Sequence, residues 1–231
     1  MSSRPLSPSV RELAFERTDG DVAFEPGQWL NLVLPLEDGS DDRRAYSIAS
    51  PPGAAPRFEV AVTRVENGPF SSRLHDLPRG AELRAEGPQG FFTRPRDAGH
   101  ASLFVATGTG LAPFRSMLCS ALESGATEPL WLLFGVRGEE DVLYRDELAR
   151  LPIEHDNVRV VVTLSRPSAS WTGARGYVQD HVARLLGELA VAGHEPHLYI
   201  CGLERMVKAV RDVARRELGL PRARVHSERY D

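Results

Sequence analysis

The segment 44–50, Arg-Ala-Tyr-Ser-Ile-Ala-Ser, carries side chains whose types and spacing suit a nucleotide ligand. Arg44 offers a rigid fork of donors that matches a phosphate. Tyr46 offers a flat ring, and Ser47 offers a hydroxyl that could reach a ring nitrogen. Ser50 ends the segment just before two strand-breaking prolines. A hydrogen-bond donor for phosphate, an aromatic ring and a hydroxyl so close together are typical of a flavin site. Taken alone, however, residues 44–47 fit an ordinary edge strand better.

A glycine-rich turn occupies residues 107–113, Thr-Gly-Thr-Gly-Leu-Ala-Pro. Gly108 and Gly110 allow the backbone to approach a ligand closely, and the proline suits the first turn of a helix. Helix-terminal amides at this place would hold a pyrophosphate, with Thr107 and Thr109 beside it. The turn is neither the G-x-G-x-x-G fingerprint nor a P-loop, so a tight strand–helix turn without a ligand explains it equally well.

Two further places offer chemistry at the ends of predicted strands. Cys201 and Gly202 follow an apolar strand, at the edge where parallel sheets bind ligands. A lone cysteine is more often a small buried hydrophobe, which is how we interpret Cys119 in a predicted helix. Another loop joins Ser165 and Arg166 to Arg175. These arginines could clamp the 2′-phosphate of NADP, or they are ordinary solvated loop residues.

The elements that must position these residues fall into two parts. Residues 9–95 show short alternating stretches separated by glycine and proline turns, which favours a small β-barrel. The strands are expected at 10–15, 30–36, 44–50, 58–65 and 82–85, with an acidic loop at 37–42, a short helix from 67–72 and a turn at 87–92.

From about residue 99 apolar strands alternate with helices. The strands are expected at 102–106, 130–134, 158–164, 198–201 and 224–227, and the helices at 112–122, 143–150, 178–189 and 204–218. Buried strands alternating with helices predict a parallel sheet with helices on both faces.

Composition excludes several classes of protein. The chain has 231 residues, of which 42% are hydrophobic, so it can bury a large core. Its net charge of −4 gives no support to nucleic-acid binding. Two cysteines are too few for a disulfide framework, and the histidines lack metal-ligand spacing, so we expect no metal. Without an apolar run of membrane length or a signal-peptide core, the sequence predicts a cytoplasmic protein that does not bind membranes.

Taken in order, these motifs resemble the ferredoxin–NADP⁺ reductase superfamily, in its compact two-domain form without an iron–sulfur module. The resemblance covers nearly the whole chain. It rests on Pro26-Gly27-Gln28, Arg44-x-Tyr46-Ser47, Gly68-x-x-Ser71, Gly87-Pro88-x-Gly90-x-Phe92, the turn at 108–113, Gly135-Val136-Arg137 and Cys201-Gly202.

The resemblance implies a six-stranded antiparallel FAD-binding β-barrel at residues 1–97, followed by a parallel-sheet NAD(P)-binding α/β domain at 98–231, with the flavin between them. FAD is favoured over FMN. The implied FAD-binding residues are Arg44, Tyr46, Ser47, Ser50, Gly68, Ser71, Ser72 and Tyr230. The implied NADPH- or NADH-binding residues are Thr107, Gly108, Thr109, Gly110, Arg137, Ser165, Arg166, Arg175, Cys201 and Gly202.

The resemblance also implies hydride transfer between nicotinamide and flavin, followed by single-electron steps. Ser47 would hydrogen-bond at the flavin N5, while Cys201 and Glu228 would orient the nicotinamide. Glu228-Arg229-Tyr230 resembles the Glu-x-Tyr ending of plant-type reductases, whose tyrosine covers the flavin, except that Asp231 follows here.

The predicted function is that of a flavoprotein oxidoreductase that moves electrons between NAD(P)H and a small carrier protein, ferredoxin or flavodoxin. One alternative is a free-flavin reductase or the NADH-dependent reductase component of an oxygenase. Another is a non-catalytic flavin-binding subunit, which the turn at 108–113 and Cys201 disfavour, because such a subunit would not need a nicotinamide site.

Overall fold

The computed structural model describes residues 1–20, 23–36, 38–53 and 57–230. Contacts divide the chain into two compact units. One comprises Met1–Arg96 and Ala112–Glu123, and the other Asp97–Leu111 and Ser124–Asp231. In the described parts, no helix has both the length and the apolar character that crossing a membrane requires.

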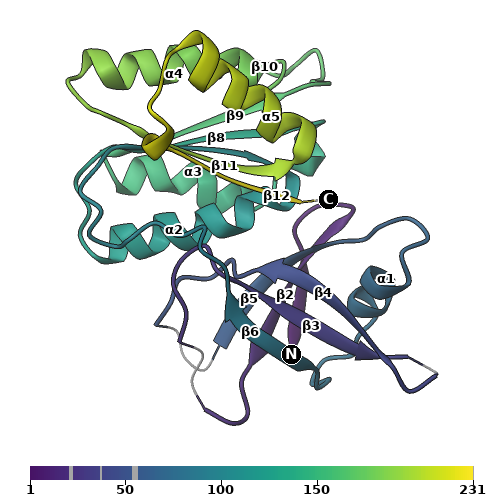
Figure 1. Ribbon diagram of the computed structural model, residues 1–231. Coiled ribbons are helices and arrows are strands. Elements are labelled where there is room, and N and C mark those ends of the chain that lie inside the picture. The colour runs from purple at the N-terminus through teal and green to yellow at the C-terminus, as the bar shows by residue number, and fades with distance from the viewer. Residues whose placement is uncertain (21–22, 37, 54–56, 231) are drawn as a thin grey trace. The chain divides into compact units, whose positions relative to one another are not determined.

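The first unit contains two three-stranded antiparallel sheets, ordered β1-β2-β5 and β4-β3-β6 (Figure 1). The bridge from Ile48 to Val60 links them. The elements are β1 (Ser2–Pro5), β2 (Val10–Glu16), β3 (Trp29–Pro35), β4 (Asp41–Ser47), β5 (Arg57–Thr63), α1 (Pro69–His75) and β6 (Arg84–Gln89). The antiparallel barrel-like fold predicted from the sequence is confirmed. Helix α2 (Leu111–Glu123) supplies the remaining residues of this unit.

Alternating side chains build the core of the barrel. Leu30, Leu32 and Leu34 of β3 are at most 3% exposed and meet Val60 and Val62 of β5 in one apolar cluster. The period of two in these strands sends every second side chain inward. Phe70 and Leu74 of α1 join the same cluster, so the short helix closes one end of the barrel.

The structure corrects several boundaries in this unit. Strand β6 runs through Gly87, so the first half of the turn expected at 87–92 is strand. Gly87 has a φ of +149°, and a Cβ there would lie 3.0 Å from Leu30 Cβ. Glycine therefore permits the register shift between β3 and β6. Strand β1 was not predicted, because four largely exposed residues carry no alternating signal.

Strand β4 also differs from its prediction. It begins at Asp41, inside the expected acidic loop, and it ends at Ser47, three residues before the expected end. The ladder with β3 pairs Asp41 with Pro35 and Ser47 with Trp29. Ion pairs of Asp41 with Arg43 on the same strand and with Arg84 on β6 make the acidic start of β4 compatible with a strand. Glu37 of the predicted loop lies outside the described residues.

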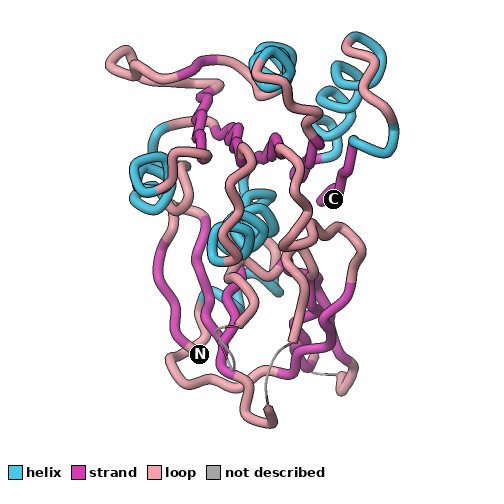
Figure 2. The backbone as a smooth tube through the Cα atoms, turned by 90° about the vertical axis from the view of Figure 1, so that its left-hand side faces the viewer, coloured by secondary structure: helices cyan, strands magenta, loops and turns pink. Residues whose placement is uncertain are grey.

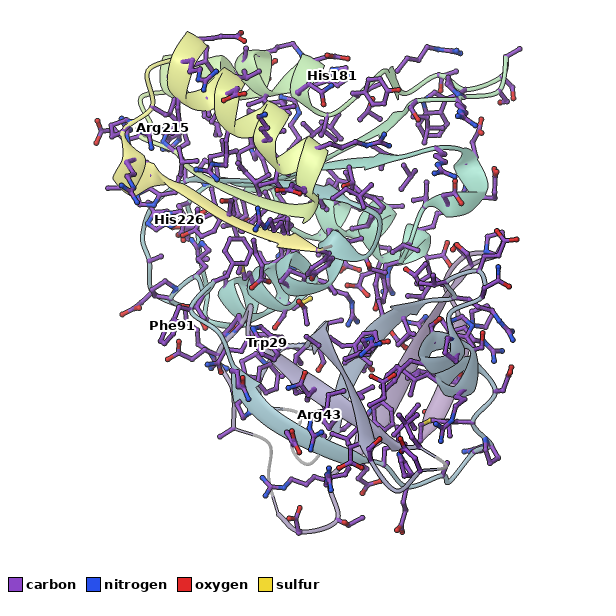
Figure 3. The ribbon with its side chains drawn as sticks, turned by 45° about the vertical axis from the view of Figure 1, so that its right-hand side comes forward. Trp29, Arg43, Phe91, His181, Arg215 and His226 are labelled. Carbon is purple, nitrogen blue, oxygen red and sulfur yellow. The ribbon has the colours of Figure 1, made fainter. Side chains whose placement is uncertain are left out.

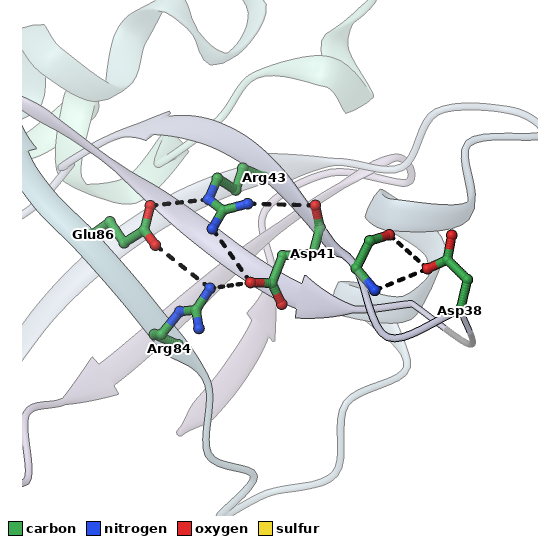
Figure 4. A network of polar contacts seen from close by, with 6 residues as sticks. Asp38, Asp41, Arg43, Arg84 and Glu86 are labelled. Carbon is green, nitrogen blue, oxygen red and sulfur yellow. Dashed lines mark hydrogen bonds and ion pairs between the residues drawn. The ribbon is translucent and has the colours of Figure 1, made fainter.

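A polar network covers the outer face of the β4-β3-β6 sheet (Figure 4). Arg43 bonds to Glu86 at 3.1 Å and to Asp41 at 3.3 Å, and Arg84 also bonds to Asp41. Val33, which pairs with Arg43 and Arg84 in the ladders, is only 2% exposed. The network therefore covers an apolar residue on the open face of the sheet.

The second unit is a six-stranded parallel sheet of order β10-β9-β8-β7-β11-β12. Its elements are β7 (Ser102–Thr107), η1 (Gly108–Gly110), β8 (Leu130–Val136), η2 (Glu139–Asp141), α3 (Arg145–Glu154), β9 (Val158–Leu164), β10 (Ala174–Arg175), α4 (Gln179–Val191), β11 (His197–Leu203), α5 (Glu204–Asp212), η3 (Val213–Glu217), η4 (Arg222–Arg224) and β12 (Val225–Tyr230). In Figure 2 the strands stand in a row with helices on both sides. The predicted parallel-sheet fold is confirmed.

Alternate side chains of β7 pack on opposite faces of this sheet. Leu103 and Val105 of β7 pack with Val182 of α4 and Val210 of α5, all buried. Phe104, between them in sequence, points to the opposite face and packs against Tyr199 at 5.4 Å between ring centroids. The strands are apolar on both faces because helices cover both.

Two boundaries differ in the second unit. The expected helix 143–150 begins at Arg145, because Tyr144 has a left-handed φ of 50°. The expected helix 204–218 is α-helical only to Asp212 and continues as a π-helical turn, Val213–Glu217. The two-residue strand β10 was not predicted, since Ala174 and Arg175 carry no strand pattern.

Candidate functional site

The turn after β7 packs directly against the turn after β11. A Cβ on Gly110 would lie 2.3 Å from the carbonyl oxygen of Cys201, and a Cβ on Gly202 would lie 2.3 Å from Thr107 Oγ1. Gly202 also has a φ of +144°, which L-residues rarely adopt. Both positions therefore require glycine, and the structure brings together two motifs that are far apart in the sequence.

The other side of this turn is open. Gly108 is exposed, has a φ of +54°, and a Cβ there would meet nothing within 4 Å. Thr107 Oγ1 is buried and has no hydrogen-bond partner among the described residues. A buried hydroxyl without a partner is costly, so a ligand that donates to it or accepts from it would stabilise the turn.

Cys201, Glu228 and Tyr230 form a cluster on the neighbouring strands β11 and β12. The parallel register pairs Cys201 with Glu228, and Tyr230 hydrogen-bonds to the Cys201 thiol. Cys201 is completely buried, which raises the pKa of its thiol, so the thiol stays neutral. Burial also raises the pKa of Glu228 to about 7, and its Oε2 has no hydrogen-bond partner in the described chain. The cluster thus holds a carboxyl group poised to change charge near neutral pH. Asp231, which follows Tyr230, lies outside the described residues.

Arginines gather at the carboxyl ends of β8 and β9. The guanidinium groups of Arg137 and Arg166 are exposed, and neither makes a hydrogen bond or ion pair with a described residue. The backbones are adjacent, because the Arg166 amide donates to the Arg137 carbonyl at 2.8 Å. Ser165 lies beside them with its hydroxyl 3.5 Å from the Val136 carbonyl. This edge offers two unpaired cations to an anion.

Arg175 is placed differently. Its guanidinium donates to the carbonyls of Trp171 at 2.7 Å and Ser168 at 3.3 Å, and so closes its own loop. His181, labelled in Figure 3, lies with Nε2 3.0 Å from the Arg175 carbonyl. Tyr177, which the sequence reasoning missed, is 62% exposed just beyond Arg175. An exposed aromatic two residues from a predicted phosphate ligand is the signal that could have found it.

The flavin motif on β4 presents its side chains over α1. The Arg44 guanidinium carbon lies 5.6 Å from the centre of the Phe70 ring, and the Tyr46 ring stacks on the same ring at 6.4 Å. Arg44 is exposed and also bonds to Asp42. Burial raises the pKa of Tyr46 to about 12, so its hydroxyl stays protonated. Strand alternation explains why Arg44 and Tyr46 share a face, and Phe70 is the platform that sequence reasoning missed.

The predicted serines have varied surroundings. Ser47 is buried at the end of β4. Ser50 accepts the Glu59 amide at 3.1 Å. Ser71 is buried, accepts the Val65 amide at 3.0 Å and donates to the Gly68 carbonyl at 3.2 Å, so its hydroxyl closes the turn before α1. Ser72 lies in the first turn of α1, its amide donating to the Gly68 carbonyl. The spacing Gly68-x-x-Ser71 is thus already accounted for by the turn.

Both regions fit the cofactors that the motifs suggest. On β4, an exposed guanidinium and a neutral phenol lie on one face, as a flavin nucleotide requires. After β7, the exposed backbone at Gly108 and the unpartnered Thr107 hydroxyl suit a nucleotide phosphate or amide.

Comparison with known proteins agrees with this division. Residues 2–93 match the oxidoreductase FAD-binding domain, and residues 104–212 match the oxidoreductase NAD-binding domain. The chain is 59% identical over 231 residues to ferredoxin–NADP reductase B of Sorangium cellulosum, covering 99% of this chain and 94% of that one. The chain belongs to the ferredoxin–NADP⁺ reductase superfamily. The resemblance inferred from the motifs is confirmed. This protein is an oxidoreductase with an FAD-binding and an NAD-binding domain.

Other members of the superfamily are more distant. The phenol hydroxylase P5 protein of Acinetobacter pittii is 30% identical over 231 residues, and the match covers 98% of this chain but only 63% of that protein. The crystal structure of the Amycolatopsis cytochrome P450 reductase GcoB superposes with a TM-score of 0.85 at 26% identity, over 99% of this chain and 67% of that one. The chain thus spans about two thirds of these longer reductases.

Proposed function

We propose that this reductase transfers a hydride from NADPH to bound FAD and passes the electrons singly to a small carrier protein. The observation that carries the proposal is the cluster at the ends of β7, β11 and β12. There, the turn after β7 leaves its backbone open at Gly108, beside a Thr107 hydroxyl with no partner among the described residues and a carboxyl group, Glu228, of raised pKa. This arrangement suits an uncharged, flat, amide-bearing ring better than it suits water.

In the proposed FAD-binding domain, residues 1–97, side chains would hold FAD. Arg44 would bind the pyrophosphate, together with Ser72 and the turn at Gly68 and Ser71. Tyr46 would lie along the flavin, Ser47 would hydrogen-bond at N5, and Ser50 would fix the strand exit through Glu59. Bound FAD would supply the conversion from two-electron to one-electron chemistry. Colourless protein that takes up no added FAD would refute this assignment.

In the proposed NAD(P)-binding domain, residues 98–231, the nicotinamide nucleotide would lie on the carboxyl edge of the sheet. The amides of Gly108, Thr109 and Gly110 would hold the pyrophosphate, with Arg137 alongside. Cys201 and Gly202 would form the floor under the nicotinamide. The Glu228 carboxyl would orient the carboxamide, and a protonated Oε would donate to its carbonyl.

A preference for NADPH over NADH is part of the proposal. The exposed guanidinium of Arg166 pairs with no residue that the structure describes. Ser165 lies beside it, and Arg175 and Tyr177 follow in the same loop. Arginine can bind a 2′-phosphate bidentately, which a ribose hydroxyl cannot match, and the tyrosine ring could stack on adenine. Steady-state kinetics with both coenzymes on wild type and Arg166→Ala test it. Wild type that favours NADH, or a variant with an unchanged ratio, would contradict it.

Tyr230 is proposed to lie against the flavin ring and to move aside for nicotinamide. Its support is its place at the end of β12, half-buried and hydrogen-bonded to Cys201. Removing the ring in Tyr230→Ser should tighten coenzyme binding and slow product release. Coenzyme titration and flavin fluorescence measure this. If both stay at wild-type values, Tyr230 lies elsewhere.

A cationic groove supports a protein electron carrier as the partner. The groove, of about 490 Å³, runs along α5 and η3 beside β12. Lys208, Arg211 and Arg215 line it, are exposed, and pair with no described residue; Figure 3 labels Arg215. An acidic carrier would be steered to such a surface, and carrier reduction should slow as salt rises.

The deciding experiment is a panel of NADPH and NADH against ferredoxin, flavodoxin and free FMN. Fast ferredoxin or flavodoxin reduction with retained FAD supports the proposal. Flavin that behaves as an exchangeable substrate would favour a free-flavin reductase. Yellow protein without any NAD(P)H oxidation would favour a non-catalytic flavin subunit. A cytoplasmic location also belongs to the proposal, and cell fractionation tests it.

The second candidate is the reductase component of an oxygenase. Its support is the match to the phenol hydroxylase P5 protein over 98% of this chain. Faster transfer from NADH to an oxygenase than to ferredoxin would favour it over the first candidate.

A further inference from the structure

Arg115, a largely buried arginine on α2, hydrogen-bonds to the segment that follows Ser47. Arg115 Nη1 donates to the Ala49 carbonyl at 3.0 Å and to Glu59 Oε2 at 2.9 Å. The side chains of Arg115 and Glu59 are only 14% and 15% exposed. Charge-assisted bonds shielded from water are stronger than exposed ones, so this contact holds its partners firmly.

The segment held by Arg115 is also anchored by other bonds, since the Ile48 amide donates to the Gln28 carbonyl at 3.0 Å and Ser50 Oγ accepts the Glu59 amide at 3.1 Å. Strand β4 ends at Ser47, and beyond it the chain contacts β5 through single bonds. Ile48 bridges Val60, and the Ala49 amide donates to the Glu59 carbonyl at 2.7 Å. With the Ala49 carbonyl bound to Arg115, both polar groups of that residue are fixed. Arg115 therefore helps set the position of the backbone two residues after Ser47.

The same helix begins at the nucleotide turn. α2 starts at Leu111, directly after Gly108–Gly110, and Arg115 follows about one helical turn later. A helix rises about 1.5 Å per residue, so roughly 6 Å of rigid backbone separates Leu111 from Arg115. Within the first unit, α2 thus carries the contact that fixes the segment proposed to hold the flavin.

We propose that Arg115 is a positioning residue for hydride transfer, acting through Ala49 and Glu59. The inference rests on the proposed function. Hydride transfer demands that donor and acceptor atoms approach within a narrow distance, and a misplacement of about 1 Å can cost on the order of 10²-fold in rate. A contact that fixes the backbone at Ala49, two residues after Ser47, limits such misplacement of the flavin segment.

The test separates positioning from stability. Arg115→Met alone would leave the largely buried Glu59 carboxylate with Arg57 only, which is itself destabilising. The double variant Arg115→Met/Glu59→Gln removes that charge, and Arg115→Lys keeps a cation with fewer donors. Arg57→Met is the matched control, since Arg57 pairs with Glu59 at 3.0 Å but is 55% exposed and makes no bond to Ala49.

The measurement is anaerobic single-turnover reduction of bound FAD by NADPH, with coenzyme affinity and thermal melting recorded alongside. We expect the double variant to retain FAD and its NADPH affinity but to reduce FAD about 10- to 100-fold more slowly. Arg115→Lys should recover part of the rate, and Arg57→Met should match wild type.

Three results would overturn the inference. One is a wild-type rate in the double variant. The others are loss of FAD from it, which would make Arg115 part of the cofactor scaffold, and an equal slowing in Arg57→Met. Wild-type protein whose FAD neither coenzyme reduces would instead refute the proposed function, and this inference with it.

Discussion

The two proposed ligand regions are built in opposite ways. On β4 the chemistry resides in exposed side chains, such as Arg44 with its ring platform Phe70. After β7 it resides in the backbone, because Gly110 and Gly202 leave no room for side chains. A region made of side chains should lose ligand binding on substitution and keep its fold. A region made of closely packed backbone should lose both.

The same contrast appears in the charged groups. Arg44 and the network around Asp41, Arg43 and Arg84 are solvated, so folding costs these charged groups little desolvation free energy. Glu228 is buried near the Cys201 thiol, and burial raises the pKa of its carboxyl to about 7. Only the second region should therefore couple stability to pH near neutrality.

Gly110→Ala should have the largest effect. Its methyl group would overlap the Cys201 carbonyl, and we expect a loss of about 3 kcal/mol in the free energy of unfolding, with loss of NADPH binding. Urea denaturation measures it. Gly187→Ala on α4 is the control, because a Cβ there meets nothing within 4 Å, and it should stabilise the helix by up to about 1 kcal/mol. Equal stability of Gly110→Ala and wild type would abolish the contrast.

Arg44→Ala should weaken FAD binding by roughly 1.5–3 kcal/mol, because a charge-assisted phosphate contact is lost. The free energy of unfolding of the apoprotein should change by less than about 0.5 kcal/mol, since the side chain is exposed. Fluorescence titration of apoprotein with FAD measures the first quantity. Arg43→Ala is the control, because its guanidinium belongs to the network of Figure 4. Equal FAD affinity in both variants would contradict the assignment of Arg44.

Glu228→Gln should change how stability depends on pH. The folded pKa of about 7 lies above the usual 4.5, so the unfolded chain releases its proton first. Wild-type stability should therefore fall as pH rises from about 4.5 through 7, by about 1–2 kcal/mol after allowance for partial solvation. The variant should lack this fall. Urea denaturation at pH 5 and pH 8 measures the change in stability of each protein. An equal change in wild type and variant would refute the prediction.

Arg84→Ala should have the smallest effect, at most about 1 kcal/mol, because the ion pairs it loses are exposed. That loss should shrink in high salt, which screens surface charges. Unfolding in low and high salt measures it. A larger, salt-independent loss would mean that covering Val33, rather than charge, is the function of the network.

Local sequence patterns were sufficient to predict many of the strands and turns of the fold. Strand β9 has the predicted bounds, Val158–Leu164, because a short run dominated by β-branched residues strongly favours a strand. The glycine turns were also found from the sequence, since glycine type and spacing report a backbone requirement directly. The roles of individual site residues stay predictions, because no motif by itself specifies its ligand.

Other features depended on contacts between distant parts of the chain. Arg115 is an ordinary helix residue until the fold brings it to Ala49 and Glu59. Likewise, the pKa of Glu228 is raised only because β12 places it beside β11 in a desolvated position. Propensity and periodicity act over a few neighbouring residues, whereas burial and charge pairing arise from segments that only tertiary packing brings together.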